Sequence, residues 1–123
     1  MKRDAISLSD VPADQQDTHE ALLEWARWCA VRSGSHVAPM FRGYQPYLYP
    51  EATGGRRPVD QLLALKVQRA YTAVPERHRL ALAWWYCFPF VGDGRVRREM
   101  GVTRMELARL VIDGRTMVKN LMR

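Results

Sequence analysis

Apolar residues recur every three or four positions along most of this chain, the spacing that lines one face of an α-helix. In the first such segment they stand at i, i+3, i+4 and i+7: Leu22, Trp25, Ala26 and Cys29. Asp17, with Glu20 three residues later, offers a capping box at the start of this segment. The pattern predicts a helix over residues 18–32. The polar residues 1–17 have no sustained periodicity and predict a flexible arm.

Glycine and proline interrupt this pattern between residues 33 and 57, where seven of them fall. Their density excludes a helix or a regular strand and predicts a long loop. The loop contains four aromatic residues: Phe41, Tyr44, Tyr47 and Tyr49. Either they pin the loop to the helical core, which is the commoner role, or they form a functional surface, since long ordered loops in small domains often carry function.

Two further helices follow, each opened by a proline. Pro58 suits the first position of a helix that ends before Pro75, and Pro75 opens another helix that Pro89 ends. The apolar stripe of the first is Val59, Leu62, Leu63, Val67, Ala70, Tyr71 and Val74, and that of the second is Leu80, Ala83, Trp84 and Cys87. Both stripes are predicted to face the core.

The last part of the chain has the pattern of a helix-turn-helix, which with the preceding helix occupies about residues 75–121. A short helix is predicted over Arg95–Met100, Gly101 breaks it, and a capping box of Thr103 and Glu106 opens a final helix that runs nearly to the end. The predicted buried face of this helix is Leu107, Leu110, Val111, Gly114, Val118 and Leu121. Its opposite face is Met105, Arg109, Ile112, Thr116, Lys119 and Arg123.

Length and composition limit the fold. The chain has 123 residues, 47% of them hydrophobic, with four tryptophans, so one core can form without disulfides or metal. Cys29 and Cys87 lie in apolar helical patterns, and we interpret them as buried thiols rather than a redox pair. The sequence therefore predicts an all-α fold, a compact five-helix domain over residues 18–123 with a C-terminal helix-turn-helix and a long aromatic loop.

Positive charge is concentrated at the C-terminal end. The net charge is +6, and residues 95–123 contain 8 Lys/Arg against 3 Asp/Glu, whereas residues 1–94 contain 11 against 10. A basic helix-turn-helix favours double-stranded DNA as a partner, although a basic face can also serve solubility alone. Base contacts are expected from the first turns of the last helix: Arg104, Met105, Ala108 and Arg109. Phosphate contacts are expected from Arg95, Arg97, Arg98, Arg115 and Lys119.

Other classes of function lack the residues that they need. His19, His36 and His78 are scattered, and no catalytic triad order, phosphate-binding glycine loop or metal-binding stretch accompanies them. We therefore expect no enzymatic activity, no metal and no cofactor. No apolar run approaches the ~18 residues of a membrane span, and the N-terminus lacks the form of a signal peptide, so a cytoplasmic protein without membrane contact is expected.

Two stretches resemble known transcription proteins. The segment from Val74-Pro75-Glu76-Arg77-His78-Arg79-Leu80 to Met100-Gly101-Val102-Thr103 looks like the fourth region of bacterial sigma factors. The segment Leu23-Glu24-Trp25-Ala26-Arg27-Trp28, followed by Gly34 and the aromatic loop, adds a more specific pattern. Over roughly residues 18–122 the chain resembles the Q antitermination proteins of lambdoid phages, in the branch typified by phage 21.

This resemblance implies a factor that binds a DNA element near a late promoter and loads onto RNA polymerase paused with sigma. It then narrows the RNA exit channel, so that terminator hairpins cannot form. Polymerase contacts are expected from the first helix and the loop: Trp28, Phe41, Arg42, Tyr44, Tyr47, Tyr49, Arg56 and Arg57. The pair Trp25 and Trp28 is also explicable as core alone.

The chain departs from the sigma pattern at one place, and two alternative functions remain compatible with the sequence. Arg97 and Glu99 stand where sigma-like domains have a small and an aliphatic residue, so the packing of that helix is expected to differ. The first alternative function is a repressor or activator, expected to be a dimer, that acts by DNA binding alone. The second is a module that docks on polymerase without specific DNA binding.

Overall fold

All described elements of the structure are helical. The computed structural model describes residues 11–31, 39–47 and 58–123, and no strand occurs among them. It contains the 3₁₀ helices η1 (Ala13–Gln15) and η2 (Pro39–Phe41) and the α-helices α1 (Gln16–Val31), α2 (Gln61–Thr72), α3 (Glu76–Cys87), α4 (Asp93–Met100) and α5 (Arg104–Leu121). The prediction of an all-α fold with five helices is confirmed.

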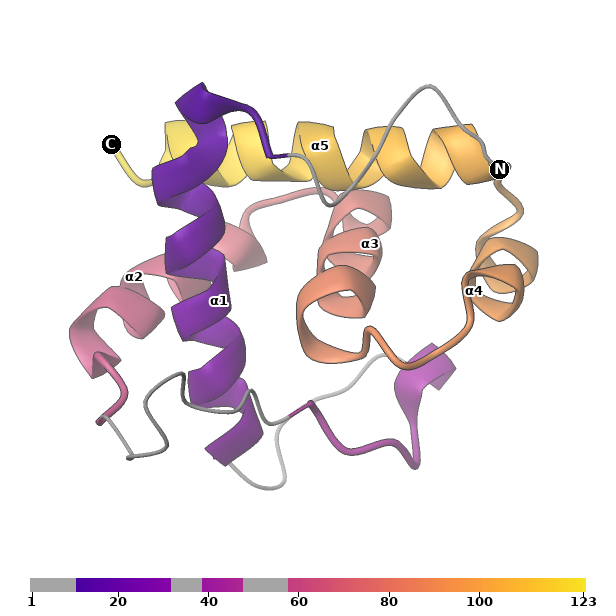
Figure 1. Ribbon diagram of the computed structural model, residues 1–123, viewed down its shortest axis with the longest axis horizontal. Helices are drawn as coiled ribbons and strands as arrows, with labels where there is room; N and C mark the ends of the chain where they lie inside the picture. The colour runs from indigo at the N-terminus through magenta and orange to yellow at the C-terminus, as the bar shows by residue number, and fades with distance from the viewer. Residues whose placement is uncertain (1–10, 32–38, 48–57) are drawn as a thin grey trace.

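Helix α3 lies at the centre of this arrangement. In Figure 1, α5 runs across one side of α3, α1 and α2 lie together, and α4 lies below the N-terminal end of α5. The buried residues of α3 are Ala81, Leu82, Trp84, Tyr86 and Cys87. They lie on all sides of the helix. The predicted stripe does face the core, with Trp84 and Cys87 buried and Leu80 and Ala83 half-buried against it, but it is only part of the buried surface of α3.

Helix α2 begins later than its sequence pattern predicts. Asp60 is its N-cap, and the Asp60 side chain accepts a hydrogen bond from the backbone N–H of Leu63 at 3.1 Å, so Pro58 lies outside the helix. The backbone N–H of Asp60 donates to Oε2 of Glu24 on α1 at 2.6 Å, which ties the two helices together. Leu62 is 83% exposed, and its predicted place in the core is wrong, since Ala64, Val67 and Ala70 form the buried side of α2.

The predicted N-terminal arm 1–17 includes residues that belong to the helical part of the structure. Residues 1–10 of that arm lie outside the described residues, but η1 and the first turn of α1 belong to the helical domain. Asp17 is inside α1 rather than at its cap, because the chain is already helical at Gln16. The side chain of Gln15 is buried against α5, where it donates to Oγ1 of Thr116 at 2.6 Å.

The aromatic segment 39–47 is attached to the end of α3. Phe41 is 1% exposed and stacks on Phe88, with 4.5 Å between the ring centroids. The backbone N–H of Tyr47 donates to the carbonyl of Cys87 at 2.7 Å. The interpretation that the aromatic residues pin the loop to the core is confirmed for Phe41, which is buried, and for Tyr44, which packs against the core, but not for Tyr47, which is exposed.

The two cysteines are free thiols. Cys87 is buried, as predicted, whereas Cys29 on α1 is only half-buried. A hydrogen bond with Cys29 and burial together raise the pKa of the Cys87 thiol. The thiol is therefore protonated and unreactive at neutral pH.

Candidate nucleic-acid interface

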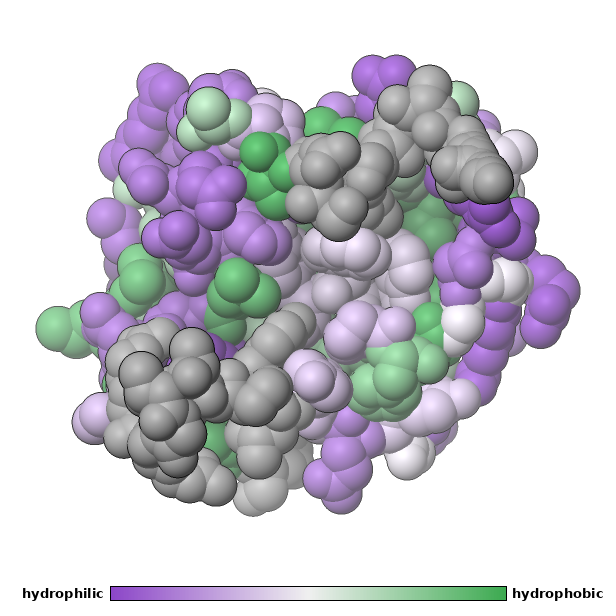
Figure 2. Space-filling view, in the orientation of Figure 1, coloured by the Kyte–Doolittle hydropathy of each residue, from purple (hydrophilic) through white to green (hydrophobic). Residues whose placement is uncertain are grey.

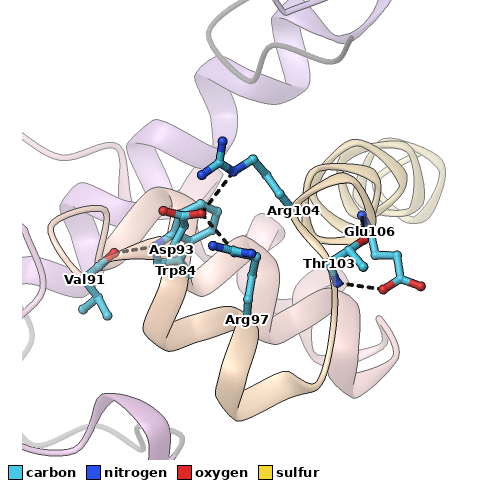
Figure 3. A network of polar contacts seen from close by, with 7 residues as sticks. All are labelled: Trp84, Val91, Asp93, Arg97, Thr103, Arg104 and Glu106. Atoms are coloured by element: carbon cyan, nitrogen blue, oxygen red, sulfur yellow. Dashed lines mark hydrogen bonds and ion pairs between the residues drawn. The ribbon is translucent and has the colours of Figure 1, made fainter. Parts of the chain in front are cut away.

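Helices α4 and α5 are joined by a tight turn that gives them the helix-turn-helix arrangement. Gly101 takes the left-handed conformation, with φ of 68°, and its N–H donates to the carbonyl of Arg97 at 2.7 Å. The predicted capping box then opens α5. Oγ1 of Thr103 accepts from the N–H of Glu106 at 3.1 Å, and Oε1 of Glu106 accepts from the N–H of Thr103 at 2.8 Å (Figure 3). The capping box thereby satisfies two backbone N–H groups at the start of α5.

The connection between α3 and α4 is also fixed. Nε1 of Trp84 donates to the carbonyl of Val91 at 2.8 Å in a buried position, as Figure 3 shows. Val91 is 4% exposed, and Val96 of α4 is fully buried. These contacts attach α4 to the core, so the motif is presented as part of one packed body.

Three of the four predicted base contacts are exposed at the start of α5. Arg104, Met105 and Arg109 are exposed. Ala108 is 5% exposed, so its prediction as a base contact is wrong. It falls on the same side of α5 as Val111 and Gly114, three and six residues later, which face the core. At the other end of α5, Leu121 is 48% exposed although the pattern placed it on the buried face.

Arg115 cannot bind phosphate in this structure, contrary to its prediction. Its side chain is fully buried, its Nε donates to Oε1 of Gln15 at 2.9 Å, and its Nη1 donates to the hydroxyl of Tyr86 at 3.3 Å. Burial raises the pKa of Tyr86, and the hydrogen bond from Arg115 opposes that rise. Arg115 therefore holds η1, α3 and α5 together.

Lys119 also differs from its prediction. It is half-buried, and its Nζ donates to the backbone carbonyl of Asp14 at 2.7 Å. It lies fifteen residues after Arg104, which is roughly 22 Å along a helix. Its contact with Asp14 and its distance from Arg104 disfavour Lys119 as a phosphate contact.

The three arginines of α4 differ in their surroundings. Arg98 is exposed. Arg97 is half-buried, and its Nε donates to Oδ2 of Asp93 at 3.1 Å. Arg95 donates to the hydroxyl of Tyr44 and to the carbonyl of Met40, the latter at 3.3 Å. The aromatic segment thus orients one predicted phosphate contact. Figure 2 shows hydrophilic residues along the edge of the molecule where α4 lies.

The start of α3 adds a residue that the sequence pattern did not single out. A groove of about 280 Å³ lies between the first turns of α3 and α5, lined by Arg77, Met105, Glu106, Arg109 and Leu110. Arg77 is exposed and therefore stands beside the base-contact candidates. No local signal places Arg77 there, because the two turns are almost thirty residues apart in sequence.

The structure buries some of the predicted polymerase contacts and exposes others. Trp28 is 8% exposed and Phe41 is 1% exposed, so both are core residues, and their prediction as surface contacts is wrong. Arg42 and Tyr47 are exposed, and Tyr44 is half-buried beside Arg95. Three further candidates, Tyr49, Arg56 and Arg57, lie outside the described residues.

No protein-family model, curated protein or solved structure matches this chain. Within the described parts of the chain, no group of three or more His, Cys, Asp or Glu side chains is placed to hold a metal ion. No helix there is both long enough and apolar enough to cross a membrane.

Proposed function

We propose that this protein is a non-enzymatic transcription antitermination factor that binds double-stranded DNA through α4 and α5 and engages RNA polymerase. The observation that carries the DNA-binding part is the cluster of Arg104, Met105 and Arg109, which are exposed on the first two turns of the capped helix α5 beside Arg77. Exposed arginines at the start of the second helix are the usual readers of base edges in such motifs.

The two kinds of DNA contact have different energetic consequences. A bidentate arginine contact to guanine contributes about 1–3 kcal/mol of discrimination between bases. Arg77, Arg95 and Arg98 are proposed as phosphate contacts, which add affinity and salt dependence but no sequence preference. The net charge of +6 supports attraction to a polyanion.

The polymerase-binding part rests on the resemblance to the phage Q proteins. The exposed residues of the aromatic segment, Arg42 and Tyr47, are the described candidates for this contact. Antitermination by such a factor needs no chemical step. The bound protein obstructs the RNA exit channel sterically, and terminator hairpins then fail to form.

Run-off transcription past an intrinsic terminator tests the proposal. Purified polymerase and sigma are used on a template with the late promoter of the source phage. Wild-type protein is expected to increase readthrough, and Arg104→Ala and Arg109→Ala are expected to abolish the increase. Arg69→Ala is the matched control, because Arg69 is exposed on α2, outside the motif.

A repressor or activator that acts by DNA binding alone is the second candidate. It is favoured by the burial of Trp28 and Phe41, which removes two residues from the expected polymerase surface. Salt-sensitive binding to the promoter fragment without any readthrough would support this candidate and exclude antitermination.

A further inference from the structure

A single carboxylate joins the two helices of the proposed DNA-binding motif. Oδ2 of Asp93, in the first turn of α4, accepts a hydrogen bond from Nε of Arg97 at 3.1 Å. The same oxygen forms an ion pair with Nε of Arg104, the first residue of α5, at 3.5 Å. Figure 3 shows both arginines pointing toward this carboxylate.

A carboxylate at this position weakens the attraction of the surface for DNA phosphates, so a surface that served only to attract phosphates would not be expected to have one. The side chains of Asp93 and Arg104 are 40% and 55% exposed, so both belong to the surface that DNA would approach. A negative charge there repels the DNA backbone and competes with it for two arginines. It also stabilises the start of α4, but an acidic residue in a first helical turn does not need two arginine partners for that effect.

The Asp93 carboxylate affects a contact to a base and a contact to a phosphate differently. Asp93 engages Arg104 through Nε, so the pair itself does not use the two Nη atoms. A bidentate contact from those Nη atoms to a guanine edge is compatible with the pair. A phosphate that approaches Arg104 or Arg97 brings a full negative charge close to the Asp93 carboxylate and is repelled by it, whereas a guanine edge is neutral.

We propose that Asp93 is a specificity-determining residue of the DNA interface, which restrains Arg97 and Arg104 from binding phosphates of non-cognate DNA and orients Arg104 toward a base. This inference rests on the proposed function, because it requires that α5 binds DNA. It also explains why Arg97 is tolerated where related motifs have a small residue. Its side chain is directed to Asp93 on its own helix.

The test compares Asp93→Asn with Glu99→Gln. Both variants remove one negative charge from α4, and Glu99 is exposed on the same helix. Affinity is measured by fluorescence anisotropy over a series of salt concentrations for two probes. The first is a duplex that the wild-type protein has selected from a randomised pool, and the second is a duplex of the same composition with a shuffled sequence.

Asp93→Asn is expected to bind the shuffled duplex about fivefold more tightly than wild type does, with a salt slope steeper by about 1 to 2, since one or two additional arginines would meet phosphates. Affinity for the selected duplex should rise much less, so that the ratio of the two affinities falls. Glu99→Gln should leave this ratio close to that of wild type. In an Arg97→Ala/Arg104→Ala background, Asp93→Asn should no longer change the ratio.

Two results would overturn the inference. If Asp93→Asn and Glu99→Gln changed the ratio of the two affinities equally, only the overall charge would matter. This inference would then fail, and the proposed function would survive. Failure of the wild-type protein to enrich any duplex from the randomised pool would overturn the proposed function together with this inference. Circular dichroism checks that the variants fold, and Asp93→Ser replaces Asp93→Asn if the latter does not, because serine is also favoured at helix starts.

Discussion

Nε of Arg115 donates a 2.9 Å hydrogen bond to Oε1 of Gln15, one hundred residues earlier in the chain, and the arginine side chain is fully buried. A buried charge is costly unless it is hydrogen-bonded, and Nη1 of Arg115 donates to the hydroxyl of Tyr86 while its Nη2 has no hydrogen-bond partner among the described residues. Gln15 therefore has a structural role, because it joins η1 to α5.

Gln15→Ala is expected to destabilise the protein by about 1–3 kcal/mol, because it removes the acceptor of Nε from a buried guanidinium. Urea unfolding followed by tryptophan fluorescence measures this change. Gln16→Ala is the matched control, since Gln16 is exposed and makes only a long contact to Glu20 among the described side chains. Equal stability of the two variants would contradict a structural role for the Gln15–Arg115 bond.

Acidification is expected to destabilise the fold through His19. Burial, and next the charge of Arg115, lower the pKa of His19 below its ordinary value of 6.5. The folded state therefore holds this histidine neutral, while the unfolded state takes up a proton near pH 6.5. Stability from this group is present above that pH and is lost as the pH falls from there through the lower folded-state pKa.

Thermal melting of wild type and His19→Gln over this pH range checks the prediction. The variant should show a weaker dependence of melting temperature on pH. Nδ1 of His19 lies 2.7 Å from the hydroxyl of Tyr86, and glutamine keeps a hydrogen-bonding group there. Identical pH profiles would show that another group controls acid stability.

Gly114→Ala is expected to destabilise the contact between α3 and α5 by roughly 1–3 kcal/mol through overpacking. A Cβ atom at Gly114 would lie 2.9 Å from Cγ and 3.0 Å from Cδ1 of Leu82, which is itself fully buried. Urea unfolding again provides the measurement. Gly94→Ala is the control, because the nearest atoms there are 3.9 Å away, at the ends of arginine side chains, and alanine should be neutral or stabilising. A Gly114→Ala variant as stable as wild type would contradict this close approach.

Arg77→Ala and Arg109→Ala are expected to weaken DNA binding in different ways. Arg77 stands at the edge of the groove between α3 and α5, as a phosphate contact would, so its loss should reduce affinity equally for all sequences and lower the salt slope by about 1. Arg109 lies on the exposed face of α5, and its loss should cost about 1–3 kcal/mol on the preferred sequence alone. Anisotropy titrations with a selected and a shuffled duplex separate the two patterns. If Arg77→Ala instead lost the preference for the selected duplex over the shuffled duplex, Arg77 would be the base contact rather than a phosphate contact.

Local pattern determined the helices and the turn of this protein. Apolar spacing located all five α-helices within a few residues, and the capping box of Thr103 and Glu106 forms as its residue types predict. These features depend on residues at most four positions apart, and their energetics are contained in short segments of sequence. Three of the four base-contact candidates lie on the exposed face for the same reason.

Tertiary packing decided which polar residues are buried and which apolar residues are exposed. The sequence pattern predicted Arg115 as a surface contact to phosphate, but packing beside Gln15 and Tyr86 buries it. Leu62 belonged to an apolar stripe and is exposed, whereas Phe41, from a loop, is buried on Phe88. Each outcome depends on which segment covers a helix face, and the spacing of residues along one helix contains no information about its neighbours.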